Sequence, residues 1–157
     1  MNSKFVFDRA PRRVYWEVTR ACDLVCRHCR AAAAHARDPK ELTTVEGFRL
    51  LDQIAAACPP TPHMVLTGGD PLKRPDVFAL IGGARARGLG VSVAPSATPL
   101  LTTEAITTLK GSGVEAISLS LDGSTAPRHD ALRGVSGASV VPWPEATLRA
   151  ARVCRFR

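Results

Sequence analysis

The sequence predicts an α/β fold in which about four parallel strands alternate with outer helices. Three short apolar segments, residues 64–67, 90–94 and 116–121, begin about 26 residues apart. The segments between them carry apolar residues at intervals of three and four, which is typical of a helix with one buried face. A strand that returns parallel to its neighbour needs such a crossover, so the alternation favours a parallel sheet with helices outside. At 157 residues and 45% hydrophobic content, the chain can form one packed core.

The first strand is predicted at residues 14–19, which are rich in aromatic and β-branched side chains. Residues 1–13 precede it as an irregular lead-in. A loop with three cysteines follows the strand. Residues 31–36 are compatible with a short helix that ends before Asp38 and Pro39, because a residue before proline is disfavoured in helical conformation.

The first long helix is predicted to begin after Thr43, because Thr43 and Glu46 have the spacing of a capping box. Its apolar positions form one buried stripe, which includes Cys58 as a small core residue. The prolines at 59, 60 and 62 end the helix. A short strand at residues 64–67 then runs into the loop Gly68-Gly69-Asp70-Pro71.

Two further helices connect the remaining strands. Pro75 suits the first turn of one helix, and Gly88 suits its C-terminal cap. Thr102 is expected to cap the next helix, which stops at Gly111. The fourth strand is predicted at residues 116–121 and ends at Asp122-Gly123.

The chemically distinctive residues follow the ends of these strands. Ligands of parallel α/β sheets bind at the carboxyl ends of the strands, so we expect these residues to share one rim. They are the cysteines after the first strand, Gly68, Gly69 and Asp70 after the second, Ser96 after the third, and Ser120 to Asp122 at the fourth.

Cys22, Cys26 and Cys29 lie within eight residues, spaced four and three apart. Three thiolates can hold three irons of a cubane cluster, which leaves a fourth iron open to another ligand. A zinc site is an alternative, since His28 or His35 is near enough to complete it. A disulfide is a less favoured one, because no secretory leader is evident.

Four segments extend the pattern beyond the cysteines. They are residues 16–22 (WEVTRAC), 66–72 (LTGGDPL), 118–123 (SLSLDG) and 129–134 (HDALRG). Together they resemble the successive motifs of the radical S-adenosylmethionine (SAM) superfamily, in the subgroup of cofactor and peptide maturases that often carries a C-terminal domain for auxiliary clusters. The resemblance covers residues from about 12 to 137. It implies a partial (βα) TIM-like barrel, with residues 14–137 as the N-terminal part of the core domain.

The resemblance also implies roles for individual residues. Cys22, Cys26 and Cys29 would hold a [4Fe-4S] cluster whose open iron binds SAM. The residues implied to bind SAM are Gly68, Gly69, Asp70, Ser96, Ser120, Asp122 and Arg133. Members often have Glu in place of Asp70, so this chain keeps a carboxylate on a shorter arm. His28 need not be a ligand, and His35, His63 and His129 are expected to be surface or loop residues.

The chemistry implied by the resemblance is reductive cleavage of SAM to methionine and a 5′-deoxyadenosyl radical, which abstracts hydrogen from a substrate. The expected class is an oxidoreductase acting in cofactor, tetrapyrrole or peptide maturation. Its expected partners are SAM, a peptide-like or tetrapyrrole-like substrate, and an external electron donor such as flavodoxin or ferredoxin.

Charge and hydropathy exclude other classes. The formal charge is +7, but the arginines are scattered and no basic run with interleaved aromatics occurs, so we expect no nucleic-acid partner. No apolar run approaches the length of a membrane span, and the N-terminus has no signal-peptide core. A cytoplasmic location is expected.

Residues 138–157 depart from the family pattern. Prolines at 142 and 144 interrupt the next expected helix, and no fifth or sixth strand follows. We interpret this tail as a sign of a frame-shifted or truncated chain, in which Cys154 is not expected to be a cluster ligand. Whether the chain is an enzyme is left open at this point. The alternatives are a non-catalytic cluster-binding fragment and a zinc-binding structural module.

Overall fold

The computed structural model describes residues 10–138. Most of the expected lead-in and the atypical tail, with Cys154, lie outside the described residues. The strands are β1 (Arg13–Thr19), β2 (His63–Gly68), β3 (Gly90–Val93) and β4 (Ala116–Ile117). The helices are α1 (Thr44–Ala57), α2 (Val77–Ala86), α3 (Thr103–Gly111) and α4 (Ala126–Arg133), with one 3-10 turn, η1 (Pro71–Lys73).

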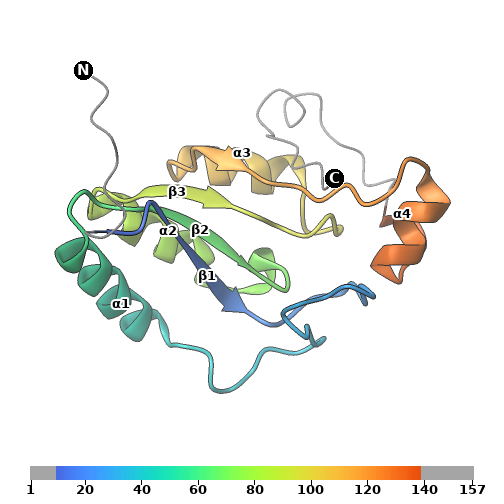
Figure 1. Ribbon diagram of the computed structural model, residues 1–157, viewed down its shortest axis with the longest axis horizontal. Helices are drawn as coiled ribbons and strands as arrows, with labels where there is room; N and C mark the ends of the chain where they lie inside the picture. Colours follow the sequence, from blue (N-terminus) through green and yellow to red (C-terminus); the bar gives the residue numbers. More distant parts are fainter. Residues whose placement is uncertain (1–9, 139–157) are drawn as a thin grey trace.

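The described strands form one parallel sheet in the order β1-β2-β3-β4. Sequential order is the arrangement of a (βα) barrel wall, in which each helix crosses over to the adjacent strand. The prediction of about four βα units with parallel strands is therefore confirmed. All four strands end at the same side of the sheet, and Figure 1 shows the cysteine loop and α4 at that side.

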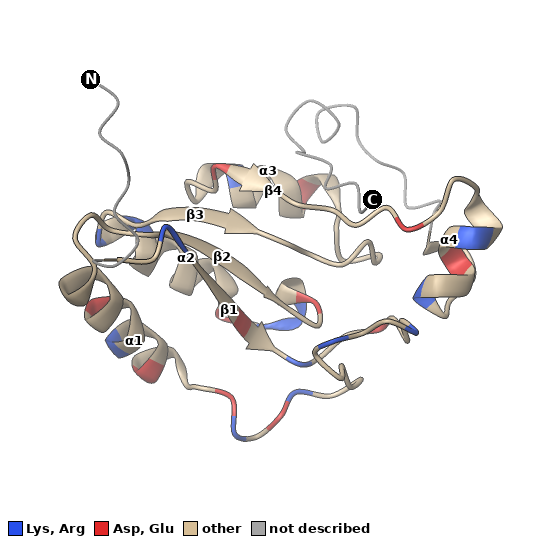
Figure 2. Ribbon diagram, viewed as in Figure 1, with Lys and Arg blue, Asp and Glu red and all other residues tan. Residues whose placement is uncertain are grey.

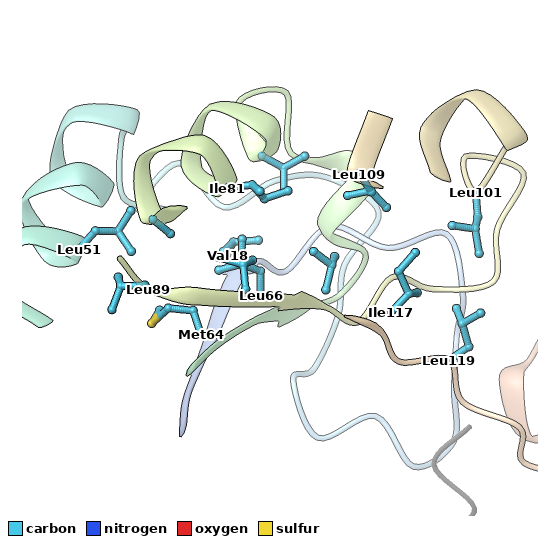
Figure 3. Close-up of a cluster of buried hydrophobic side chains, with 14 residues drawn as sticks. Val18, Leu51, Met64, Leu66, Ile81, Leu89, Leu101, Leu109, Ile117 and Leu119 are labelled. Atoms are coloured by element: carbon cyan, nitrogen blue, oxygen red, sulfur yellow. The ribbon is translucent and has the colours of Figure 1, made fainter. Parts of the chain in front are cut away.

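The core lies between the sheet and helices α1 to α3 (Figure 3). Val18, Leu66 and Val93 reach it from the strands, while Leu51 and Ile81 reach it from α1 and α2. Each of these side chains is almost fully buried, which stabilises the fold by about 1.5–3 kcal/mol for each one. On the opposite face of β1, Tyr15 is 63% exposed, as strand alternation requires.

The helix caps follow the sequence closely. Thr43 and Glu46 form the expected capping box at α1, and Thr102 accepts the Ala105 amide at α3. Gly88 follows the C-cap Arg87 of α2 and has φ +75°, which favours glycine.

Three expectations about local structure are corrected, and one helix was not expected. Residues 31–36 form turns and an isolated bridge instead of a helix. Pro75 lies before α2 and not in its first turn; the N-cap is Asp76, whose side chain is held by Arg74 and makes no capping hydrogen bond. The fourth strand is shorter than residues 116–121, because its partner β3 ends at Val93. Helix α4 was not predicted.

Candidate functional site

The cysteine loop leaves the end of β1 and is fixed there by backbone hydrogen bonds. Cys22 donates its amide to the carbonyl of Ala34 at 2.8 Å, and Ala34 donates to the carbonyl of Arg20 at 2.9 Å. Cys22 is buried, Cys26 is half-buried and Cys29 is exposed, so the three cysteines run from the core edge to the surface.

All cysteines of the described region, including Cys58, are free thiols. Within residues 10–138, no three His, Cys, Asp or Glu side chains are grouped closely enough to hold a single metal ion. Burial raises the pKa of the Cys26 thiol, the Arg133 guanidinium opposes this increase, and negative charge on Cys22 and Cys29 adds to it.

The loop after β2 rests directly on the start of the cysteine loop. Gly69 donates its amide to the carbonyl of Thr19 at 2.8 Å, and Asp70 donates to that of Ala21 at 2.7 Å. A Cβ on Gly68 would lie 2.2 Å from the Thr19 oxygen, and one on Gly69 would lie 2.4 Å from the Ala21 oxygen. Gly68 also has φ +137°. Both glycines are thus needed for the two loops to pack together.

Asp70 is fully buried and organises the third loop of the rim. Its carboxylate accepts hydrogen bonds from the Thr98 hydroxyl at 2.8 Å and the Leu72 amide at 3.1 Å, while the Ser96 amide lies at 3.4 Å. Burial raises the pKa of Asp70, and these hydrogen bonds oppose the rise. The Asp70 side chain is therefore engaged in holding the loops after β2 and β3 together.

Ser96 brings the first three loops together. Its hydroxyl donates to the Gly69 carbonyl at 2.9 Å and lies 3.5 Å from the Cys22 sulfur. The structure thus places three of the predicted site residues, from the ends of β1, β2 and β3, in direct contact.

A second group of predicted residues lies where the chain leaves β4 and enters α4. Asp122 Oδ2 is 2.6 Å from Arg133 Nη2, and Arg133 Nη1 is 3.7 Å from the Cys26 sulfur. The Asp122–Arg133 contact is an ion pair without hydrogen-bond geometry, so the buried Oδ2 has no hydrogen-bond donor among the described residues. Ser120 is half-buried nearby in sequence and makes no side-chain hydrogen bond to another described residue.

The histidines divide into two groups. His28 and His35 are exposed, and His28 Nε2 is 3.9 Å from Asp122 Oδ1. The expectation of a surface or loop position is wrong for the other two. His129 is buried in α4, where its Nδ1 accepts the Asp122 amide at 3.2 Å. His63 is half-buried in β2, and its Nε2 lies 2.6 Å from the Ser92 hydroxyl.

Helix α4 is attached to the cysteine loop by its last turn. Val25 donates its amide to the Arg133 carbonyl at 3.1 Å, and Arg27 donates to the Leu132 carbonyl at 3.0 Å. Gly134 ends the helix at φ +71°, and a Cβ there would lie 2.3 Å from the Val25 oxygen. Pro127 in the first turn and Gly134 after the last were the available signals for this helix.

Two charged residues, which no sequence pattern singled out, hold the ends of the cysteine loop. Arg74 is 1% exposed and donates to the carbonyls of Val18 and Leu42, both at 2.7 Å. Glu41 accepts the Thr19 hydroxyl at 2.6 Å and Arg37 Nε at 2.7 Å. Lys73 also pairs with Asp23 within the loop.

Comparisons with known proteins agree with this arrangement. The model of the Radical SAM superfamily matches residues 16–154. The AdoMet-dependent heme synthase of Methanosarcina barkeri is 42% identical over 129 residues, which are 82% of this chain and 36% of that protein. The mycofactocin maturase MftC of Mycobacterium tuberculosis is 34% identical over 125 residues, which are 80% of this chain and 31% of that protein.

The fold is also similar to that of solved structures. Streptococcus suis SuiB bound to the precursor peptide SuiA superposes with a TM-score of 0.74 at 18% identity, covering 92% of this chain and 33% of that one. The chain therefore spans about a third of the length of each of these three proteins. No helix among the described residues is long and apolar enough to cross a membrane. The family predicted from the sequence is confirmed, because the superfamily model covers most of the sequence: the chain belongs to the radical SAM superfamily.

Proposed function

We propose that this chain binds a [4Fe-4S] cluster through Cys22, Cys26 and Cys29 and cleaves SAM reductively at the same rim. The observation that carries the proposal is the meeting of Cys22 with the loops that follow β2 and β3, and of Cys26 with Arg133 of α4. Ser96 bridges Gly69 and Cys22, and Arg133 bridges Cys26 and Asp122. Residues distant in sequence thus surround the thiols on more than one side.

The donor set fits the proposed cluster. The three cysteines lie on one loop and none of them is in a disulfide. Backbone amides already point at two of them, with Leu24 N 3.4 Å from Cys22 Sγ and Ala33 N 3.4 Å from Cys29 Sγ. Hydrogen bonds to cluster sulfurs are among the features by which proteins set reduction potentials.

The remaining site residues have distinct roles in the proposal. Gly68 and Gly69 leave the backbone of the β2 loop free of side chains, and buried Asp70 keeps this loop in place. Arg133 is suited to a carboxylate, because its guanidinium can donate two parallel hydrogen bonds. The Asp122 carboxylate, which is ion-paired with Arg133, can also accept a hydrogen bond from a hydroxyl, and Ser120 offers a second polar group.

When bound, the cluster supplies one electron that breaks the C5′–S bond of SAM, giving methionine and a 5′-deoxyadenosyl radical. The protein's own part is to hold, orient and shield. For the whole protein, we propose a cytoplasmic role in cofactor, tetrapyrrole or peptide maturation, with an external donor such as flavodoxin or ferredoxin. The names of the heme synthase, mycofactocin maturase and SuiB–SuiA matches support these substrate classes.

The proposal is tested by anaerobic reconstitution of the chain with iron and sulfide, followed by metal analysis. We expect about four irons per chain, which drop strongly in Cys22→Ala, Cys26→Ala and Cys29→Ala variants but not in Cys58→Ala. Cys58 is the matched control, because it is a free thiol at the C-cap of α1, outside the cysteine loop. One bound zinc and no visible absorption would replace the proposal with a structural zinc module. A cluster without any 5′-deoxyadenosine after reduction with SAM would leave only a cluster-binding protein.

A further inference from the structure

Strand β1 lies at the edge of the described sheet, with β2 on one side and no described strand on the other (Figure 1). In a parallel pair, alternate residues of a strand turn their backbone N–H and C=O groups toward the neighbour. The His63 amide donates to the Arg12 carbonyl, so the even-numbered residues of β1 face β2. Arg13, Tyr15 and Glu17 therefore turn their N–H and C=O groups to the free edge. We call these three residues the β1 edge.

The side chains of the β1 edge point to the face of the sheet opposite the helices, because they alternate with residues that pack on the core. All three are exposed. None of them makes a hydrogen bond or an ion pair with another side chain between residues 10 and 138. Figure 2 shows the two charges apart, with a blue segment where β1 begins and a red segment close to its end. The β1 edge thus offers free backbone groups and free charges to a partner.

The free edge has limits at both ends. Pro11 has no backbone N–H to donate, and the carbonyl of Thr19 already accepts the Gly69 amide at 2.8 Å. A strand that adds to β1 can therefore hydrogen-bond fully only along residues 13–17. Tyr15 is the middle of this stretch.

The β1 edge is complementary to itself. When two antiparallel copies pair with Tyr15 opposite its counterpart, Arg13 of each copy lies opposite Glu17 of the other. Opposite charges directly across an antiparallel pair attract, and aromatic residues across it pack together. A pairing centred on Arg13 or on Glu17 instead places like charges opposite each other, which is destabilising. The positions of the charges thus favour one register and one partner, which is a second copy of this chain.

We propose that two copies of this chain associate through the β1 edge, as antiparallel neighbours related by a two-fold axis. The backbone groups of Arg13, Tyr15 and Glu17 supply the hydrogen bonds, and the two Arg–Glu pairs fix the register. A contact of this kind uses the same surface on both copies and closes on itself, so it gives a dimer. It also covers an edge that would otherwise be open to pairing with other chains. The dimer requires neither the cluster nor SAM, so it is tested independently of the proposed function.

The test measures self-association of the 157-residue chain by sedimentation equilibrium over a range of protein concentrations. Two single variants, Arg13→Glu and Glu17→Arg, each place like charges opposite each other in the dimer. Lys110→Glu is the matched control, because it makes the same charge change as Arg13→Glu at an exposed position of α3. Circular dichroism checks that each variant is folded.

We expect a dimer that forms with increasing concentration for the unaltered chain and for Lys110→Glu. Each single variant should raise the dissociation constant of the dimer by about tenfold or more, because two attractive pairs become repulsive. An equimolar mixture of Arg13→Glu and Glu17→Arg should associate again, since the two glutamates of one chain then face the two arginines of the other. The double variant Arg13→Glu/Glu17→Arg should also recover the dimer. A mixture of Glu17→Arg with Lys110→Glu should not gain from the added charge.

Amide hydrogen exchange locates the contact. The amides of Arg13, Tyr15 and Glu17 should become protected as the concentration rises, whereas those of Val14 and Trp16, which face β2, should change little. A chain that stays monomeric would overturn the proposal, as would a dimer that the single variants weaken no more than the control does. A mixture of the single variants that fails to associate would overturn the antiparallel register. Protection of the odd-numbered amides already in the monomer would show that another segment covers the edge, and would also refute the dimer.

Discussion

Arg74 provides the sharpest test of how the cysteine loop is held. Its guanidinium donates to Val18 O before the loop, to Leu42 O after it, and to both carboxylate oxygens of Asp76 at 2.9 and 3.0 Å. It also lies 5.9 Å from the centre of the Trp16 ring. The Arg74→Met change keeps an apolar chain but removes every donor, leaving the two carbonyls without this partner and the Asp76 carboxylate with only the Thr44 hydroxyl.

We expect Arg74→Met to lower the free energy of unfolding by about 3–5 kcal/mol, the usual cost of removing one partner of a buried ion pair. The individual hydrogen bonds are not added to this value, because they belong to the same group. Arg74→Lys should recover only part of the loss, since an ammonium cannot reproduce the planar fork that reaches three partners.

Arg87 offers a matched control. It pairs with both Asp52 oxygens at 2.7 and 3.0 Å and lies 5.5 Å from the Phe48 ring, but this pair is at the surface. Arg87→Met should therefore cost far less. Urea unfolding followed by circular dichroism measures both variants. Equal losses for Arg74→Met and Arg87→Met would refute the conclusion that burial makes Arg74 an anchor.

Three further changes test other contacts of the site. Gly134→Ala should destabilise the chain by more than Gly88→Ala, as measured by urea unfolding. Both glycines have positive φ, which costs a residue with a side chain about 1–2 kcal/mol. Only at Gly134 does the added Cβ meet another residue, at 2.3 Å. Asp70→Ala should cost about 1–3 kcal/mol by leaving the Thr98 hydroxyl and the Leu72 amide without their acceptor. Asp70→Asn should cost much less, because its carbonyl oxygen can accept from Leu72 while its NH2 group donates to the Thr98 hydroxyl oxygen. Similar losses for the two variants in the same assay would contradict the hydrogen-bond role. Burial alone would raise the pKa of Glu41, but hydrogen bonds from Thr19 and Arg37 lower it overall, so the folded state binds fewer protons than the unfolded state. The stability that Glu41 contributes is thus present above its ordinary pKa of 4.5 and is lost as pH falls through the lower pKa of the folded state. The unaltered chain should therefore lose its stability advantage over the Glu41→Gln variant in unfolding curves recorded at acid pH. An advantage that persists at low pH would contradict this.

The alternating strands and helices could be predicted because they depend on local patterns. The capping box at Thr43, the cap at Thr102 and the left-handed Gly88 are each specified by a few adjacent residues. The common rim followed from those elements, because parallel strands place their ends together. The length of the fourth strand did not follow, since it depends on where its partner β3 stops.

The contacts within the rim could not be predicted in the same way. Glycines at 68 and 69 were expected to allow a ligand to approach, whereas they also allow the β2 loop to pack on residues 19–21. A buried Arg74 goes against the usual exposure of arginine, and only its distant partners explain it. The burial of His129 could not be predicted either, because it depends on a contact with the distant loop at Asp122.

The central claim is that the rim holds a cluster with one iron open to SAM. It is tested most directly by electron paramagnetic resonance of the reconstituted, dithionite-reduced chain, recorded with and without SAM. We predict a reduced cubane signal that changes when SAM is added. The change should be much weaker in the Arg133→Met variant at the same SAM concentration. The Arg128→Met variant should behave as the unaltered chain does. Folded protein that gives no cluster signal, or a signal that SAM leaves unchanged, would contradict the account.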